Sequence, residues 1–273
     1  MKTIGKKTSP IISEATSMTM QDMLNDLLAN VVLMHTDDKL MLGHMQSDWT
    51  GLAPILEEDI AASAMSQDDL SHAMILMEWL SEKYGLDVDS IGFRRRAEDY
   101  RCCDLATVPD NFDWSVSLVR RWLLATFSSI GIDRLATTDD ASLSARCRRI
   151  QDEQAIQLKY LSAWMVRLGS GTDESRERMQ TALELLTPEA GMMFEPPDAT
   201  LSDKDACCSD RDDVFQQWIE IVSPTLRDAG LTTTFELPDR QATGGRRGIH
   251  AAHFIEQLEE MTEVIGTDAD ASW

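Results

Sequence analysis

The chain has 273 residues, of which 43% are hydrophobic, and its 47 acidic and 25 basic side chains give a formal net charge of −22. This length and hydrophobic content suffice for one large globular domain with a sizeable core. The negative charge argues against a protein that binds nucleic acid, because affinity for a phosphate backbone needs clustered lysines and arginines.

The cysteines and the hydropathy pattern indicate where such a protein works. Five cysteines occur without a C-x-x-C spacing, which fits neither a zinc site nor a disulfide framework. No run of about eighteen apolar residues is present, so the sequence predicts neither membrane spanning nor export. We therefore expect reduced thiols and a cytoplasmic location.

The first predicted element is a long amphipathic helix. Residues 1–18 are polar, which indicates a mobile leader. We expect residues 19–273 to form a single helical domain. From residue 20 to residue 49 the apolar residues recur largely at three- and four-residue steps, which predicts one helix, bent near Asp37 and Asp38.

The same periodicity predicts helices along the rest of the chain. Glu57, Glu58 and Asp59 suit a first helical turn, where the helix dipole favours acids, and Gly85 suits the position beyond a helix end. Further helices are predicted at about 55–84, 113–130, 141–168, 174–186, 213–226 and 249–265. This pattern indicates an all-α fold, with a four-helix core bundle at about 20–168 and extra C-terminal helices at about 174–265.

Four segments carry a family resemblance. They are Gly244-Gly245-Arg246-Arg247-Gly248-Ile249-His250 and the stretches Leu56 to Ala61, Glu98 to Arg101 and Trp164 to Ser175. Taken together they resemble the C subunits of bacterial phenylacetyl-CoA epoxidases, which belong to the phenylacetic acid catabolic protein family. The resemblance covers most of the chain, from about residue 35 to the end.

The resemblance implies a ferritin-like bundle and a place in a multicomponent monooxygenase. In the family, the complex uses oxygen and NADPH-derived electrons, delivered through a separate reductase, to epoxidise the ring of phenylacetyl-CoA. A C-type chain is implied to be a non-catalytic structural subunit. Its expected partners are the homologous di-iron A subunit, in a heterodimer or a larger assembly, and the other oxygenase components.

A di-iron bundle has a defined ligand inventory, which this sequence does not meet. Two helices each supply a Glu, and two each supply a Glu-x-x-His whose spacing places both side chains on one face. Asp69 and His72 form a half-match on the second long helix, and Glu153 on the fourth has no histidine three residues later. The third long helix has no acid between Trp114 and Ile132.

The expected consequence is a chain without catalytic residues and without a bound metal or cofactor. Asp69, His72 and Glu153, together with Gln157, are then expected to form hydrogen bonds with one another or with water, because buried polar groups need partners. The alternative is a catalytic oxygenase subunit that binds metal through Asp69, His72 and Glu153 with an acid such as Asp38.

The basic residues near the C-terminus and the fold itself leave two further alternatives open. Arg246 and Arg247 could contact a partner's carboxylates or an anionic CoA phosphate, since arginine suits both, or they could pair with acids of this chain. The bundle could also serve as a helical interaction protein with no oxygenase attached.

Overall fold

The structure is a computed structural model that describes residues 18–197, 211–239 and 242–267. The predicted leader at 1–18 and the predicted polar break at 196–210 lie almost entirely outside these residues. No β-strand occurs among the described residues, and the all-α prediction is confirmed. No helix in the described part of the chain is both long and apolar enough to cross a membrane.

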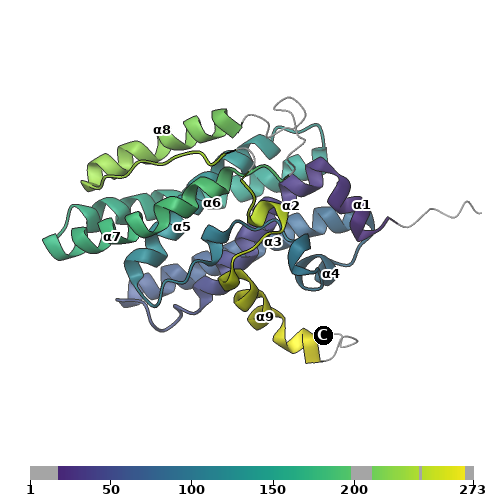
Figure 1. Cartoon of the computed structure of the whole chain (residues 1–273), viewed down its shortest axis with the longest axis horizontal. Helices are drawn as coiled ribbons and strands as arrows, with labels where there is room; N and C mark the ends of the chain where they lie inside the picture. The colour runs from purple at the N-terminus through teal and green to yellow at the C-terminus, as the bar shows by residue number, and fades with distance from the viewer. Residues whose placement is uncertain (1–17, 198–210, 240–241, 268–273) are drawn as a thin grey trace, which may run out of the picture.

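Four long helices form a ferritin-like bundle, and shorter helices cover its sides (Figure 1). The helices are α1 Met20–Asn25, α2 Leu27–Ser47, α3 Leu56–Tyr84, α4 Val88–Phe93, α5 Trp114–Leu135, α6 Ala141–Gly169, α7 Asp173–Ala190, α8 Arg211–Ala229 and α9 Ala252–Thr267. Short 3₁₀ helices occur at Ala97–Asp99, Asp104–Thr107, Gly191–Phe194 and Gly245–Arg247. The bundle consists of the pairs α2/α3 and α5/α6, with α7 and α8 packed on the second pair.

Side-chain caps fix several of the predicted boundaries. The Asp113 carboxylate accepts a hydrogen bond of 2.9 Å from the backbone N–H of Ser115 at the start of α5, and Asp140 accepts one of 2.9 Å from Leu143 at the start of α6. Such caps satisfy backbone donors that have no partner inside the helix. At the other end of α3, Gly85 adopts a left-handed conformation with φ of 66°.

The first predicted helix is broken, but at a different place from the predicted bend. Asp26 has an extended backbone, and its carboxylate accepts a hydrogen bond from the N–H of Ala29, so it ends α1 and caps α2. Asp37 and Asp38 lie in regular helix and are buried. The chain is continuously helical at the predicted bend, and both acids are paired with arginines.

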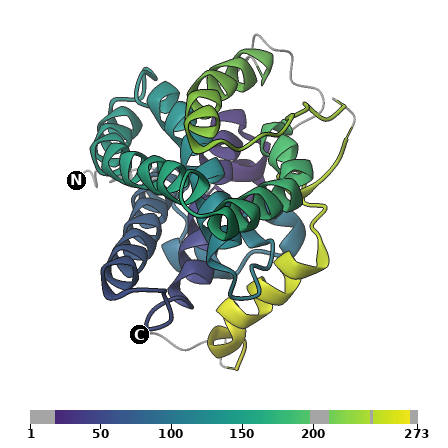
Figure 2. The same cartoon turned by 90° about the vertical axis from the view of Figure 1, so that its left-hand side faces the viewer.

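Helix α2 is the centre of the molecule. Every residue from Ala29 to Gly43 is buried, and the helix is enclosed by α3, α5, α9 and shorter elements. In Figure 2, which views the molecule along its longest axis, α2 lies inside the molecule and α3 lies at its edge. Polar side chains of α2 must therefore find partners within the protein.

Candidate functional site

The centre of the bundle, where a ferritin-like protein would hold metal, contains a buried ion-paired cluster. Lys39 from α2, Asp69 and His72 from α3, and Arg121 from α5 are each at most 4% exposed. The Lys39 ammonium lies 3.3 Å from one oxygen of Asp69, and the Arg121 guanidinium donates to the other oxygen at 2.5 Å. One carboxylate therefore binds two cations.

His72 extends this cluster towards the surface. Its Nδ1 lies 3.5 Å from the Lys39 ammonium, and its Nε2 lies 2.8 Å from the carboxylate of Glu153 on α6. Burial lowers the pKa of His72, and the charge of Lys39 lowers it further, against the opposing effect of Glu153. These neighbours assign a neutral ring whose Nδ1 accepts from Lys39 and whose Nε2–H donates to Glu153.

Gln157, the last of the candidate residues, forms its hydrogen bond beside the cluster. Gln157 of α6 donates to Asp68 of α3 at 2.9 Å. The expectation that Asp69, His72, Glu153 and Gln157 form hydrogen bonds is thus confirmed. Only His72 and Glu153 pair with each other. The partners of Asp69 are the two cations Lys39 and Arg121, which were not among the residues predicted from the sequence.

The residues of this cluster do not fit a di-iron centre. Such a centre needs carboxylate oxygens from the two helices that lack the Glu-x-x-His motif. The side chains that α2 and α5 direct at Asp69 are an ammonium and a guanidinium. Both carry the same sign of charge as a metal ion and cannot donate an electron pair while protonated. Burial lowers the pKa of Arg121, although Asp69 opposes this effect.

The small cavity beside the cluster is also unlike a substrate site. It is lined by Lys39, Asp69 and Arg121 together with apolar residues of α5, and it has room for about one water molecule. Asp38, the further acid of the catalytic alternative, lines the same cavity, but both its oxygens bind Arg246. The arrangement can hold the helices together through charge, and it has no space for an aromatic ring.

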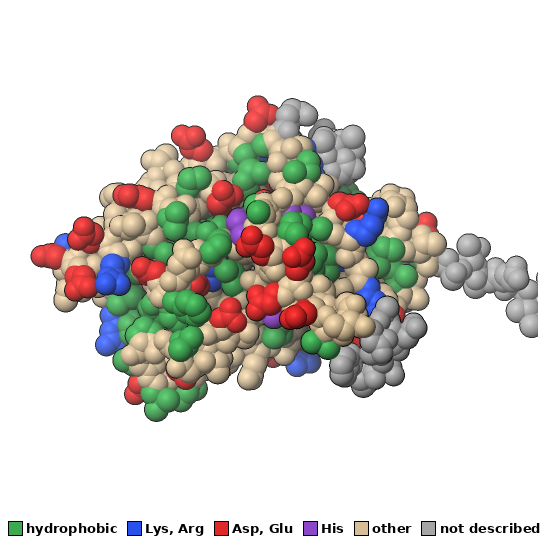
Figure 3. Space-filling view, turned by 60° about the horizontal axis from the view of Figure 1, so that its bottom comes forward, with side chains coloured by type: hydrophobic (Ala, Val, Ile, Leu, Met, Phe, Trp, Pro, Cys, Tyr) green, Lys and Arg blue, Asp and Glu red, His purple; other side chains and the backbone are tan. Residues whose placement is uncertain are grey.

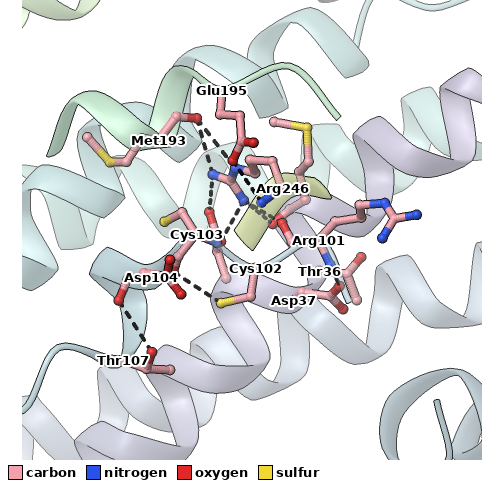
Figure 4. Close-up of polar contacts among 12 residues, drawn as sticks. Thr36, Asp37, Arg101, Cys102, Cys103, Asp104, Thr107, Met193, Glu195 and Arg246 are labelled. Atoms are coloured by element: carbon pink, nitrogen blue, oxygen red, sulfur yellow. Dashed lines mark hydrogen bonds and ion pairs between the residues drawn. The ribbon is translucent and has the colours of Figure 1, made fainter. Parts of the chain in front are cut away.

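Arg246 forms the second buried cluster, shown in Figure 4. The side chain is wholly buried, and its guanidinium donates to both oxygens of Asp38 at 2.7 Å and to the carbonyl oxygen of Arg101 at 2.8 Å. Burial opposes the charged form, yet Asp38 raises the pKa of Arg246 above its usual value. Of the two alternatives for Arg246, the structure favours pairing with an acid of this chain, because its guanidinium is enclosed and binds Asp38.

The neighbouring residues of the same motif fix the segment in place. Glu195 accepts hydrogen bonds from the backbone N–H groups of Gly244 at 2.7 Å and Arg246 at 3.1 Å. A side chain at Gly245 would lie 2.0 Å from the carbonyl oxygen of Cys102, so only glycine permits this approach. Arg247 donates to the Pro196 carbonyl at 3.1 Å, and a partner contact of Arg247 stays a prediction.

His35 supplies a prediction on pH. Burial lowers its pKa to about 3, aided by the charges of Arg246 and Lys39. The unfolded chain takes up a proton near pH 6.5 and the folded chain does not, so the free energy of unfolding is expected to fall as the pH drops from about 6.5 towards 3. The limiting slope is about 1.4 kcal/mol per pH unit. Urea unfolding between pH 7 and pH 5 should give a shallower dependence for His35→Gln than for the wild type, and equal slopes would contradict this assignment.

Comparisons with known proteins identify the family of this chain. The sequence profile of a family described as "Phenylacetic acid catabolic protein" matches residues 7–273. The chain is 28% identical over 230 residues to the C subunit of 1,2-phenylacetyl-CoA epoxidase from Escherichia coli (strain K12), in an alignment that covers 82% of this chain and 90% of that protein. The chain therefore belongs to the phenylacetic acid catabolic protein family.

Proposed function

We propose that this chain is a non-catalytic structural subunit of a phenylacetyl-CoA 1,2-epoxidase type monooxygenase, and that it scaffolds the di-iron A subunit in aerobic phenylacetate catabolism. The observation that carries the proposal is the Lys39 ammonium between Asp69 and His72. A fixed cation there neutralises the acid that a metal would otherwise bind. The likeness to the C subunit of a named epoxidase supports the same assignment.

The proposal assigns the chemistry to other chains of the complex. The di-iron centre and the pocket for the acyl-CoA belong to the homologous A subunit, and NADPH-derived electrons arrive through a separate reductase. This chain binds neither cofactor and works in the cytoplasm, in a heterodimer or a larger assembly. The role of this chain is to bind the A subunit and keep it in place, and a bundle held together by buried ion pairs suits that role.

Co-expression with the A subunit tests this proposal. The two chains should elute as one complex in size-exclusion chromatography, and iron quantification on the separated chains should find iron with the A subunit only. Iron retained by this chain would favour the catalytic alternative, with Asp69, His72 and Glu153 as ligands. A stable chain that never binds an A subunit would favour a helical interaction protein with no oxygenase.

A further inference from the structure

Two potential metal ligands at the centre of the bundle face a single cation of the protein itself. The Lys39 ammonium lies 3.3 Å from Oδ1 of Asp69 and 3.5 Å from Nδ1 of His72. Carboxylate oxygens and imidazole nitrogens are common ligands of divalent metal ions in proteins. In the described part of the chain, no group of three or more His, Cys, Asp and Glu side chains could hold a metal ion. Asp69 and His72 are therefore two ligands of an incomplete set, and an ammonium lies between them.

His72 is oriented in the way that a metal-binding histidine is. Its Nε2 lies 2.8 Å from the carboxylate of Glu153, so Nε2 carries the ring hydrogen and the lone pair of Nδ1 is directed at Lys39. Histidines that bind a metal almost always donate their other ring N–H to a carboxylate, a carbonyl oxygen or water, which fixes the tautomer. The ring is fully buried, so water does not compete for Nδ1. The contact with Glu153 is thus the outer contact of such a histidine.

Asp69 is fixed by an outer partner in the same way. The Arg121 guanidinium donates to Oδ2 at 2.5 Å, which leaves Oδ1 to the Lys39 ammonium. Carboxylates that bind a metal are likewise held by hydrogen bonds from groups that do not touch the metal. Oδ1 of Asp69 and Nδ1 of His72, which we call the half-site, therefore converge on one position. The Nζ atom of Lys39 occupies that position.

We propose that the Lys39 ammonium substitutes for a metal ion, and that this one side chain prevents the half-site from binding a divalent cation. The proposal goes beyond the proposed function, because it concerns the free chain and requires no partner. A protonated amine offers no lone pair and carries the same sign of charge as a metal ion. Glu153 is then a positioning residue that acts through His72, and not a ligand as in the catalytic alternative.

The substitution Lys39→Glu is expected to complete the half-site. Glutamate is one atom shorter than lysine, so its oxygen can take the place of Cε and leave the position of Nζ to an ion. The cavity lined by Lys39 and Asp69 has room for about one water molecule as a further ligand. Three protein ligands with one water are the usual set of an open zinc site. The substitution also makes the cluster more negative by two units of charge, which a divalent cation offsets.

Binding of Co²⁺ and Zn²⁺ to the purified full-length chain tests the proposal. Acidic side chains are spread over the surface, as on the face shown in Figure 3, and bind divalent cations weakly. Excess Mg²⁺, which prefers oxygen ligands, is therefore present throughout. The Lys39→Glu variant should bind one Co²⁺ per chain and show the visible absorption of an ion with few ligands, and Zn²⁺ should raise its melting midpoint. The wild type should show neither effect.

Two control variants separate this site from the surface. Lys39→Glu combined with His72→Gln lacks the imidazole and should bind Co²⁺ about 100-fold more weakly or worse, since even the loss of an outer partner can cost that much. Lys83→Glu makes the same exchange at the surface. Lys83 also binds an aspartate, with 3.0 Å between its ammonium and Asp26, but both side chains are 33% exposed. This variant should bind Co²⁺ no better than the wild type.

Several results would overturn the proposal. One is a wild-type chain that binds Co²⁺ at the cluster, and another is a folded Lys39→Glu variant that binds it no better than the double variant. A Lys39→Glu chain that folds only with Co²⁺ or Zn²⁺ present would support the proposal. If it does not fold even then, Lys39→Gln supplies the same oxygen without the charge, and absence of bound Co²⁺ or of folding in this variant would also overturn the proposal. A chain that never binds an A subunit would contradict the proposed function alone.

Discussion

Replacing Asp69 by leucine is expected to destabilise this protein by about 3–5 kcal/mol, the usual cost of removing one partner from a buried ion pair. The carboxylate of Asp69 is the shared partner of Lys39 and Arg121, and all three residues are at most 4% exposed. Without it, two buried cations remain beside each other. Urea unfolding of the purified variant and the wild type, at the same pH and salt, gives the difference directly.

The control removes the whole charged set. A triple variant with Asp69→Leu, Lys39→Met and Arg121→Met should recover most of the lost stability, because replacing a complete buried ion cluster by apolar residues of similar volume is often neutral. A triple variant as unstable as Asp69→Leu would show that packing, and not unpaired charge, causes the loss. A single variant with wild-type stability would contradict the cluster itself.

Arg246→Ala is expected to have an effect of similar size, about 3–5 kcal/mol, because Asp38 would stay buried without its counter-ion. Arg246 also donates to backbone carbonyl groups of Met34 and Arg101, which tie the C-terminal segment to α2 and to the loop after α4. The midpoint of urea unfolding should fall, and protease should cut the segment near residue 246 more readily. Retention of the wild-type midpoint would contradict the conclusion that this arginine stabilises the fold by binding the C-terminal segment to α2.

Arg96 offers a matched control for Arg246. It also binds an aspartate through two nitrogens, with distances of 3.0 and 3.2 Å to Asp99, but its side chain is 70% exposed. Water already solvates the guanidinium there, so Arg96→Ala should leave the unfolding midpoint nearly unchanged. A loss as large as that of Arg246→Ala would mean that burial does not explain the difference between the two pairs.

The sequence predicts the helices well because periodicity and capping are local signals. Helix α3 begins and ends where the acids and Gly85 predict. The sequence predicts that the third long helix ends at residue 130, before Gly131, whereas α5 continues to Leu135. Gly131 does not end the helix: it makes room for the ring of His35, which lies 2.1 Å from where a side chain would begin. The role of this glycine depends on a residue nearly one hundred positions away.

The candidate site was predictable only in part, because some of its residues come together only through the packing of distant segments. Asp69 and His72 share a helix face, so their spacing is visible in sequence. Lys39 and Arg121 come from other helices, and only packing brings them to Asp69. A signal was nevertheless present, because a basic residue inside an apolar helix must be paired when it is buried. Lys39 in α2 and Arg121 in α5 both meet that description.

The three consecutive charges of α2 have a consequence for how the chain is made. Asp37 pairs with Arg95, Lys39 with Asp69, and Asp38 with Arg246, which lies 208 residues further along the chain. At a synthesis rate of roughly 5–20 residues per second, the counter-ion of Asp38 leaves the ribosome roughly 10–40 s after Asp38 does. Through that interval the most central helix of the bundle holds an acid that lacks its counter-ion, although the backbone N–H of Cys103 can already donate to it. A segment that is synthesised late therefore completes the interior around a helix that is synthesised early.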